Sequence, residues 1–104
     1  MVIDKETRVR LDYIFKHFGY ASQVLKIDEE SKELQEALIE TYKQPTPQNK
    51  EHVLEELADV FVVLNQFKMF FKISDKKLQD QIEFKTRRTI DRIKHGYYDK
   101  KSKP

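Results

Sequence analysis

The sequence predicts an all-α protein of three or four long helices with antiparallel neighbours. Apolar residues recur at alternating spacings of three and four, the period of a helix that buries one face, and no segment carries a strand signal. Helix breakers divide the chain at Gly19, at the proline-rich segment 44–49 and at Gly96. Only 38% of the 104 residues are hydrophobic and 37% are charged, as is common for helical proteins that bury further apolar surface by association. We therefore expect oligomerisation to complete the core.

Length and composition restrict the organisation of the chain. A protein of 104 residues can bury one core but not two, so we expect a single domain over residues 1–98 and a disordered, basic tail over residues 99–104. Cysteine is absent and no charged segment followed by an apolar one opens the chain, which argues against a disulfide framework and a leader peptide. The longest apolar run, residues 60–64, is far shorter than the about 18 residues of a membrane span. We expect a soluble, cytoplasmic protein.

Two helices are expected in the first half of the chain. The first covers residues 4–18 and is followed by Gly19, where a C-terminal cap belongs. The second covers residues 20–42 and has one core stripe at alternating spacings of three and four. That stripe consists of Val24, Ile27, Ser31, Leu34 and Leu38.

The central helix is expected over residues 50–71, after a loop at residues 44–49 in which Pro45 and Pro47 oppose helix continuation. It is the most apolar segment. Because each residue of an α-helix is rotated by about 100° from the one before, its apolar residues occupy opposite faces of the helix. We therefore expect this helix to be buried. Asp59 interrupts the apolar run, and an ionised carboxylate taken out of water costs several kcal/mol unless a cation meets it. Asp59 thus needs a partner.

The last helix is expected to begin after Ser74, a suitable N-cap, and to end near Gly96. Its apolar stripe is thin and its cationic face is wide. The net charge of +2 conceals an acidic middle, residues 28–59, and a basic part from Lys76 onward. A carboxylate-rich region paired with a cation-rich one suits a metal-bound polyanion as well as plain salt bridging.

Two pairs of carboxylates stand at i, i+3 spacing on these helices. Glu30 and Glu33 lie on the second helix, and Glu56 and Asp59 lie on the central one. Antiparallel helices joined by a short loop can bring both pairs face to face. Four converging carboxylates repel one another unless cations bind, and hard oxygen ligands in this number suit Mg²⁺ or Mn²⁺. For Glu30 and Glu33 alone, the competing interpretation is a solvated helix flank.

The carboxylate motifs resemble those of a known family. The segments EESKEL at residues 29–34 and EELADV at residues 55–60 look like the paired ExxE and ExxD motifs of MazG-like, all-α nucleoside triphosphate pyrophosphohydrolases. The resemblance spans residues 20–98 and implies a four-helix bundle with antiparallel long helices, assembled as a homodimer or homotetramer. It implies a catalytic centre in which Mg²⁺, with Mn²⁺ as the alternative, is bound by four residues: Glu30, Glu33, Glu56 and Asp59.

The same resemblance implies hydrolysis of a nucleoside triphosphate to the monophosphate and pyrophosphate. Lys85 and Arg88 are similar to cationic positions on the family's last helix, and Arg92 shares their face. These three side chains would bind the phosphates of a substrate, in their own subunit or in a neighbouring one. Lys26, one turn before Glu30, and Asn65 are further candidates for substrate contact. No base-recognition motif is visible, so the preferred nucleotide stays open.

Two other functions remain as alternatives. Phosphoribosyl-ATP pyrophosphohydrolase shares the helical plan, but it would need to recognise a second phosphoribosyl group, for which the sequence offers no distinct motif. A non-catalytic module would bind protein or nucleic acid through the basic last helix, with strong salt dependence and no need for the carboxylates. The acidic centre argues against that module. We therefore expect a nucleotide substrate, with no membrane or nucleic-acid partner, in nucleotide-pool cleaning.

Overall fold

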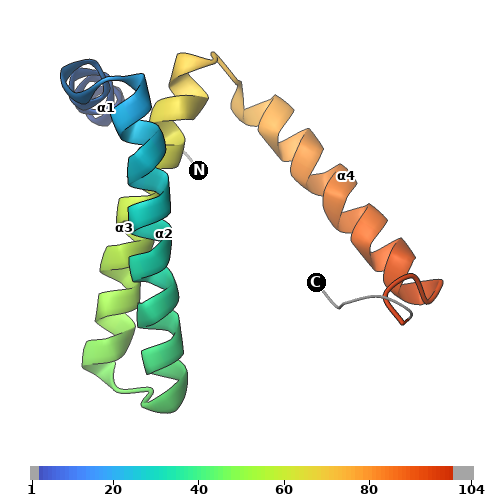
Figure 1. The fold of residues 1–104 in the computed structure, drawn as a ribbon. Helices are drawn as coiled ribbons and strands as arrows, with labels where there is room; N and C mark the ends of the chain where they lie inside the picture. The colour runs from blue at the N-terminus through green and yellow to red at the C-terminus, as the bar shows by residue number, and fades with distance from the viewer. Residues whose placement is uncertain (1–2, 100–104) are drawn as a thin grey trace. The chain divides into compact units, whose positions relative to one another are not determined.

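The computed structural model describes residues 3–99, which contain four α-helices and no strand (Figure 1). This confirms the all-α prediction. The helices are α1 Lys5–Phe18, α2 Tyr20–Lys43, α3 Pro47–Phe70 and α4 Asp75–Lys94. None of them is long and apolar enough to cross a membrane.

The chain separates into two compact units, Met1–Lys72 with α1 to α3 and Ile73–Pro104 with α4. The single domain over residues 1–98, the four-helix bundle and its completion by oligomerisation stay predictions. The tail expected to be disordered, residues 99–104, lies outside the described residues except for Asp99.

Both glycines that were expected to end helices do so. Gly19 has φ 88° and its N–H donates to the Phe15 carbonyl at 2.8 Å, so it closes α1 and turns the chain into α2. Gly96 has φ 70° and follows α4. The Tyr97 N–H donates to the Arg92 carbonyl at 2.9 Å, and the Gly96 N–H donates to that of Ile93 at 3.2 Å. This pair of bonds is a Schellman motif, which needs the left-handed conformation that glycine adopts at low cost.

The α2–α3 hairpin is held at its closed end by side-chain hydrogen bonds. The Asn49 amide nitrogen Nδ2 donates to the Gln44 carbonyl at 2.8 Å, and Thr41 Oγ1 donates to the Asn49 carbonyl at 3.2 Å. The connection contains only residues 44–46, so α2 and α3 run antiparallel side by side (Figure 1). A short, tied connection fixes which residues of the two helices face each other.

Pro47 does not belong to the loop, contrary to the sequence-based expectation. It is the first residue of α3, and the Thr46 hydroxyl accepts a hydrogen bond from the Asn49 N–H at 3.1 Å as the N-cap. Proline is tolerated in the first helical turn because its missing N–H has no intrahelical partner there and its φ is already helical. Ser74 caps α4 in the same way, as predicted, by accepting from the Lys77 N–H at 3.1 Å.

The seam of α2 that faces α3 differs from the predicted stripe. The buried residues of α2 are Gln23, Glu30 and Ala37, which recur every seven residues and therefore lie on one line along the helix. Val24 and Leu38, expected in the core, are 43% and 50% exposed. The helix is thus rotated so that a small residue and two polar residues meet α3. This rotation brings Glu30 into the interior.

The expected burial of the central helix was also wrong for the single chain. Of the described α3 residues only Val63 and Gln66 are buried, whereas Val62 is 39% and Leu64 is 44% exposed. Within residues 3–72, α1 and α2 cover one side of α3, and its remaining apolar side chains face outward. Aromatic side chains fill the junction with α1, where the ring centroids of Phe15 and Phe67 lie 5.4 Å apart.

The end of α3 offers a stability test. Lys72 has φ 55° in a position where glycine is favoured after a helix, and left-handed backbone costs other residues about 1–2 kcal/mol. Part of this cost is offset because glycine is more flexible in the unfolded chain. Lys72→Gly is expected to raise the free energy of unfolding in urea by about 0.5–1 kcal/mol. Gly19→Ala is the opposite control and should lower it, and a lower stability of Lys72→Gly would contradict this account of the turn.

Candidate metal centre

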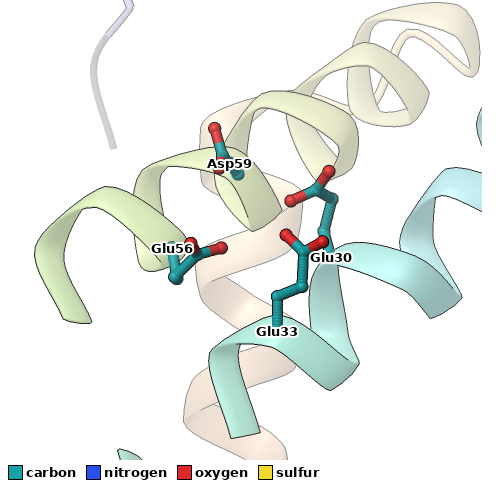
Figure 2. A group of neighbouring side chains, drawn as sticks. All are labelled: Glu30, Glu33, Glu56 and Asp59. Atoms are coloured by element: carbon teal, nitrogen blue, oxygen red, sulfur yellow. The ribbon is translucent and has the colours of Figure 1, made fainter. Parts of the chain in front are cut away.

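The α2–α3 hairpin brings both carboxylate pairs together. Figure 2 shows Glu30 and Glu33 on α2, and Glu56 and Asp59 on α3, as neighbouring side chains of two adjacent helices. One oxygen of each residue lies within 4.8 Å of the corresponding oxygens of the other three. The i, i+3 spacing places each pair on one flank of its helix, and the short hairpin sets the two flanks opposite each other.

The spacing of these oxygens suits a divalent cation. Ligand oxygens on opposite sides of an octahedral Mg²⁺ are about 4.2 Å apart, twice the Mg–O distance of about 2.1 Å. The observed spread of 4.8 Å exceeds this only slightly. Without a cation, two ionised carboxylates at this separation repel each other by about 3 kcal/mol at an effective dielectric constant of about 20. The cluster can therefore hold a metal ion, and it gains stability by doing so.

Burial strengthens this interpretation. Glu30 is only 6% exposed, and among the described residues neither its Oε2 nor Oε2 of Glu56 has a hydrogen-bond partner. Buried polar atoms are nearly always paired in native proteins, so these two carboxylate oxygens are available as ligands of a cation, while Oε1 of Glu56 lies 3.7 Å from Nε2 of His52. Asp59, expected to be the buried carboxylate, is exposed. Glu30 is buried instead of Asp59 because Glu30 lies on the side of α2 that faces α3, whereas the side of α3 that carries Asp59 is not covered by another helix of this unit.

Lys26 partly neutralises the cluster. Its ammonium nitrogen lies 3.2 Å from Oε1 of Glu30 and 3.3 Å from Oε1 of Glu29. The hydrogen bond to Glu30, followed by the one to Glu29, raises the pKa of Lys26 above its ordinary value. A sequence-predicted substrate contact therefore stands directly beside a predicted metal ligand.

Lys26→Met tests whether this ammonium competes with a metal ion. The variant is expected to bind Mn²⁺ about tenfold more tightly, because a positive charge within a few ångströms of the cation is removed. Calorimetric titration of the nucleotide-free protein measures the change. Lys32→Met is the matched control, since Lys32 pairs with Asp28 at 3.0 Å on an exposed part of the same helix. Unchanged or weaker Mn²⁺ binding by Lys26→Met would show that the ammonium and the metal do not share the site.

A groove opens beside the carboxylates, with a volume of about 400 Å³. Its lining includes four charged side chains: Lys26, Glu29, Glu30 and Asp59. Its other walls come from α1, α2 and α3 and include the apolar residues Ile14, Phe18, Leu25, Val62 and Val63 and the buried amides of Gln23 and Gln66. Small-molecule sites commonly have volumes of about 300–1,000 Å³, mostly apolar walls and a few polar groups. The cluster thus adjoins a groove of suitable size for a small organic molecule.

No protein-family model matches this chain, and no match is found among curated proteins or solved structures. A function for this protein must therefore be inferred from its residues and their geometry.

Of the remaining predicted substrate contacts, Asn65 lies outside this groove. Asn65 lines a different, apolar pocket with Leu54 and Phe61, and its Nδ2 donates to the Phe61 carbonyl at 2.7 Å. The cations predicted to bind phosphate lie on α4, in the second compact unit. Their roles stay predictions.

The cations of α4 are arranged along one face of that helix. Lys85, Arg88 and Arg92 stand at three-and-four spacing, and Lys85 is exposed. The guanidinium carbon of Arg88 lies 5.4 Å from the centre of the Phe84 ring, and that of Arg92 lies 4.8 Å from the centre of the Tyr97 ring. Stacking on an aromatic ring orients a guanidinium without neutralising it, so both groups retain their charge for an anion.

Sequence reasoning missed the two buried glutamines of the groove. Gln23 precedes Glu30 by one heptad, and Gln66 follows Asp59 by one heptad. Because α2 and α3 are antiparallel, both glutamines are displaced from the carboxylates toward the same end of the hairpin. A polar residue at heptad distance from a predicted ligand was the signal that could have found them.

Proposed function

We propose that this protein is a Mg²⁺-dependent nucleotide pyrophosphohydrolase of the MazG-like kind. It would cleave ribo- or deoxyribonucleoside triphosphates to the monophosphate and pyrophosphate, in nucleotide-pool cleaning. The observation that carries the proposal is the convergence of two carboxylate pairs, with unpartnered buried oxygens on Glu30 and Glu56, beside a groove of about 400 Å³. Few chemistries other than divalent-metal binding would use four carboxylates in this arrangement.

The roles of the carboxylates follow from their burial. Bound Mg²⁺ would supply charge neutralisation for the polyphosphate and a lower pKa for an attacking water. Glu30 and Glu56, the less exposed pair, would hold the metal from within the hairpin. Glu33 is exposed, so its carboxylate would be free to orient a water and accept its proton while the α,β-phosphoanhydride bond breaks.

Association into a homodimer or homotetramer belongs to the same proposal. Apolar side chains on α4 support it, since Ile82 and Ile90 are each 53% and Ile93 is 59% exposed, and exposed apolar surface of this kind is typical of interaction sites. In such an assembly Lys85, Arg88 and Arg92 would hold the β- and γ-phosphates, from the same subunit or from a neighbour.

The test is a product analysis in Mg²⁺ with a panel of ribo- and deoxyribonucleoside triphosphates and with phosphoribosyl-ATP. We expect monophosphate and pyrophosphate as the only products for at least one nucleotide, with loss of activity in EDTA and in Asp59→Ala. Glu55→Ala serves as the matched control because Glu55 is an exposed carboxylate on the same helix. If phosphoribosyl-ATP is the only compound cleaved, the protein is a phosphoribosyl-ATP pyrophosphohydrolase. Salt-dependent nucleic-acid binding without any cleavage would select the non-catalytic module.

A further inference from the structure

Gln66 is a buried amide without a partner. Its side chain lies on α3 and is only 2% exposed, and neither Oε1 nor Nε2 has a hydrogen-bond partner among residues 3–99. A buried amide loses its hydrogen bonds to water, so leaving both atoms unpaired destabilises the free protein. An apolar residue of similar size would avoid that cost. A glutamine in this position is accounted for if a ligand pairs with it.

The position of Gln66 relative to the metal centre points to one part of a nucleotide. Gln66 lies seven residues after Asp59, and Gln23, 5% exposed, lies seven residues before Glu30. At 1.5 Å per residue both amides stand about 10 Å along the hairpin from the carboxylates, in the same direction. The groove that contains Glu30 and Asp59 also contains both glutamines. A molecule whose phosphates reach the metal centre can therefore extend its other end to Gln66.

The apolar part of the groove's lining is suited to a flat, apolar body. Ile14, Phe18, Leu25 and Val62 line the groove, and none of them can hydrogen-bond through its side chain. A nucleobase has apolar faces and an edge on which donors and acceptors adjoin. A primary amide offers one acceptor and two donors in one plane, so it can pair with such an edge through two hydrogen bonds.

We infer that the groove binds the nucleobase of the substrate and that Gln66 is the residue that hydrogen-bonds to the edge of the base. This inference rests on the proposed function, because the carboxylates must hold the phosphates for the base to reach Gln66. Gln66 is then a specificity-determining residue. It pairs with the substrate and leaves the metal centre unchanged when it is replaced.

The experiment measures binding rather than turnover. Wild-type protein and Gln66→Leu are titrated, in Mg²⁺, with the non-hydrolysable α,β-methylene analogues of the four ribo- and four deoxyribonucleoside triphosphates and with base-free deoxyribose triphosphate. We expect wild type to bind at least one base-containing analogue about a hundredfold more tightly than the base-free compound. Gln66→Leu should lose that preference while binding base-free triphosphate and Mn²⁺ as wild type does.

Two controls separate recognition from folding. Gln35→Leu changes an exposed glutamine on α2 and should leave every affinity unchanged. The melting temperature of nucleotide-free Gln66→Leu should equal or exceed that of wild type, since an unpaired buried amide is removed. A lower melting temperature with unchanged base preference would show that Gln66 is structural and would overturn the inference.

The inference and the proposed function fail in different ways. If wild type binds base-free triphosphate as tightly as the complete nucleotides, the metal centre holds phosphates but the groove does not recognise a base, and only the inference is wrong. If no triphosphate binds in Mg²⁺, with or without a base, the proposed function is wrong and the inference falls with it.

Discussion

Replacing Glu56 with glutamine is expected to reduce pyrophosphate release on the order of a thousandfold. The change keeps the size of the side chain but removes the charge of a predicted metal ligand whose Oε2 is buried and unpartnered in the described structure. Losing one electrostatic contact to the reacting centre commonly costs about a hundredfold to a thousandfold in turnover, and a metal ligand also sets the occupancy of the cation. The rate constant at saturating nucleotide and Mg²⁺ measures the effect.

The neighbouring residue provides the comparison for this variant. Glu55→Gln removes the same charge from the same helix, but Glu55 is exposed and lies outside the cluster of four carboxylates. It should retain turnover within about twofold, because an exposed charge outside the cluster contributes little to the interactions within it. Equal losses in both variants would mean that only the general negative potential of the acidic region matters. Full activity of Glu56→Gln would remove Glu56 from the catalytic centre.

Divalent metal is expected to raise the melting temperature by on the order of 10 °C. A ligand present at 100 times its dissociation constant stabilises a protein by about 2.7 kcal/mol, and each kcal/mol shifts the midpoint by about 4–8 °C for a domain of 60–100 residues. Binding should also relieve the repulsion among the carboxylates, which lie within 4.8 Å of one another. Thermal denaturation followed by circular dichroism, with Mg²⁺ or Mn²⁺ and then EDTA, measures the shift.

Glu30→Gln distinguishes site binding from a general salt effect. Glu30 contributes the most buried carboxylate of the cluster, so this variant should show little response to Mg²⁺ while NaCl at equal ionic strength affects both proteins alike. A full metal-induced shift in Glu30→Gln would place the stabilising ion elsewhere on the protein.

The sequence was sufficient to predict the carboxylate cluster because its determinants are local. The i, i+3 spacing fixes each pair on one flank of a helix, and the connection between α2 and α3 is too short to allow anything but an antiparallel hairpin. The helix ends at Gly19, Ser74 and Gly96 were also predictable, since backbone sterics and capping chemistry act within a few residues. Pro47 was misplaced because a proline can open a helix as well as oppose one.

Burial was not predictable in the same way, because it depends on which surfaces other segments cover. The apolar residues of α3 predicted a buried helix, yet Leu64 is 44% exposed because α1 and α2 cover one side only. Glu30 became the buried carboxylate through a rotation of α2 that its apolar stripe did not indicate. Gln66 was overlooked because a glutamine gives no signal on its own. Its significance comes from being 2% exposed, without a hydrogen-bond partner among the described residues, and in one groove with Glu30 and Asp59.

The central claim is that Glu30, Glu33, Glu56 and Asp59 form a divalent-metal site, and Mn²⁺ binding followed by electron paramagnetic resonance tests it most directly. The signal of free Mn²⁺ disappears as the ion binds, so titration gives the number of sites and their affinity. We predict saturable binding to wild type that Mg²⁺ competes away, with loss of that binding in Glu30→Gln and in Glu56→Gln and retention in Glu55→Gln. Saturable binding that is equal in all four proteins, or no saturable binding to wild type, would contradict the claim.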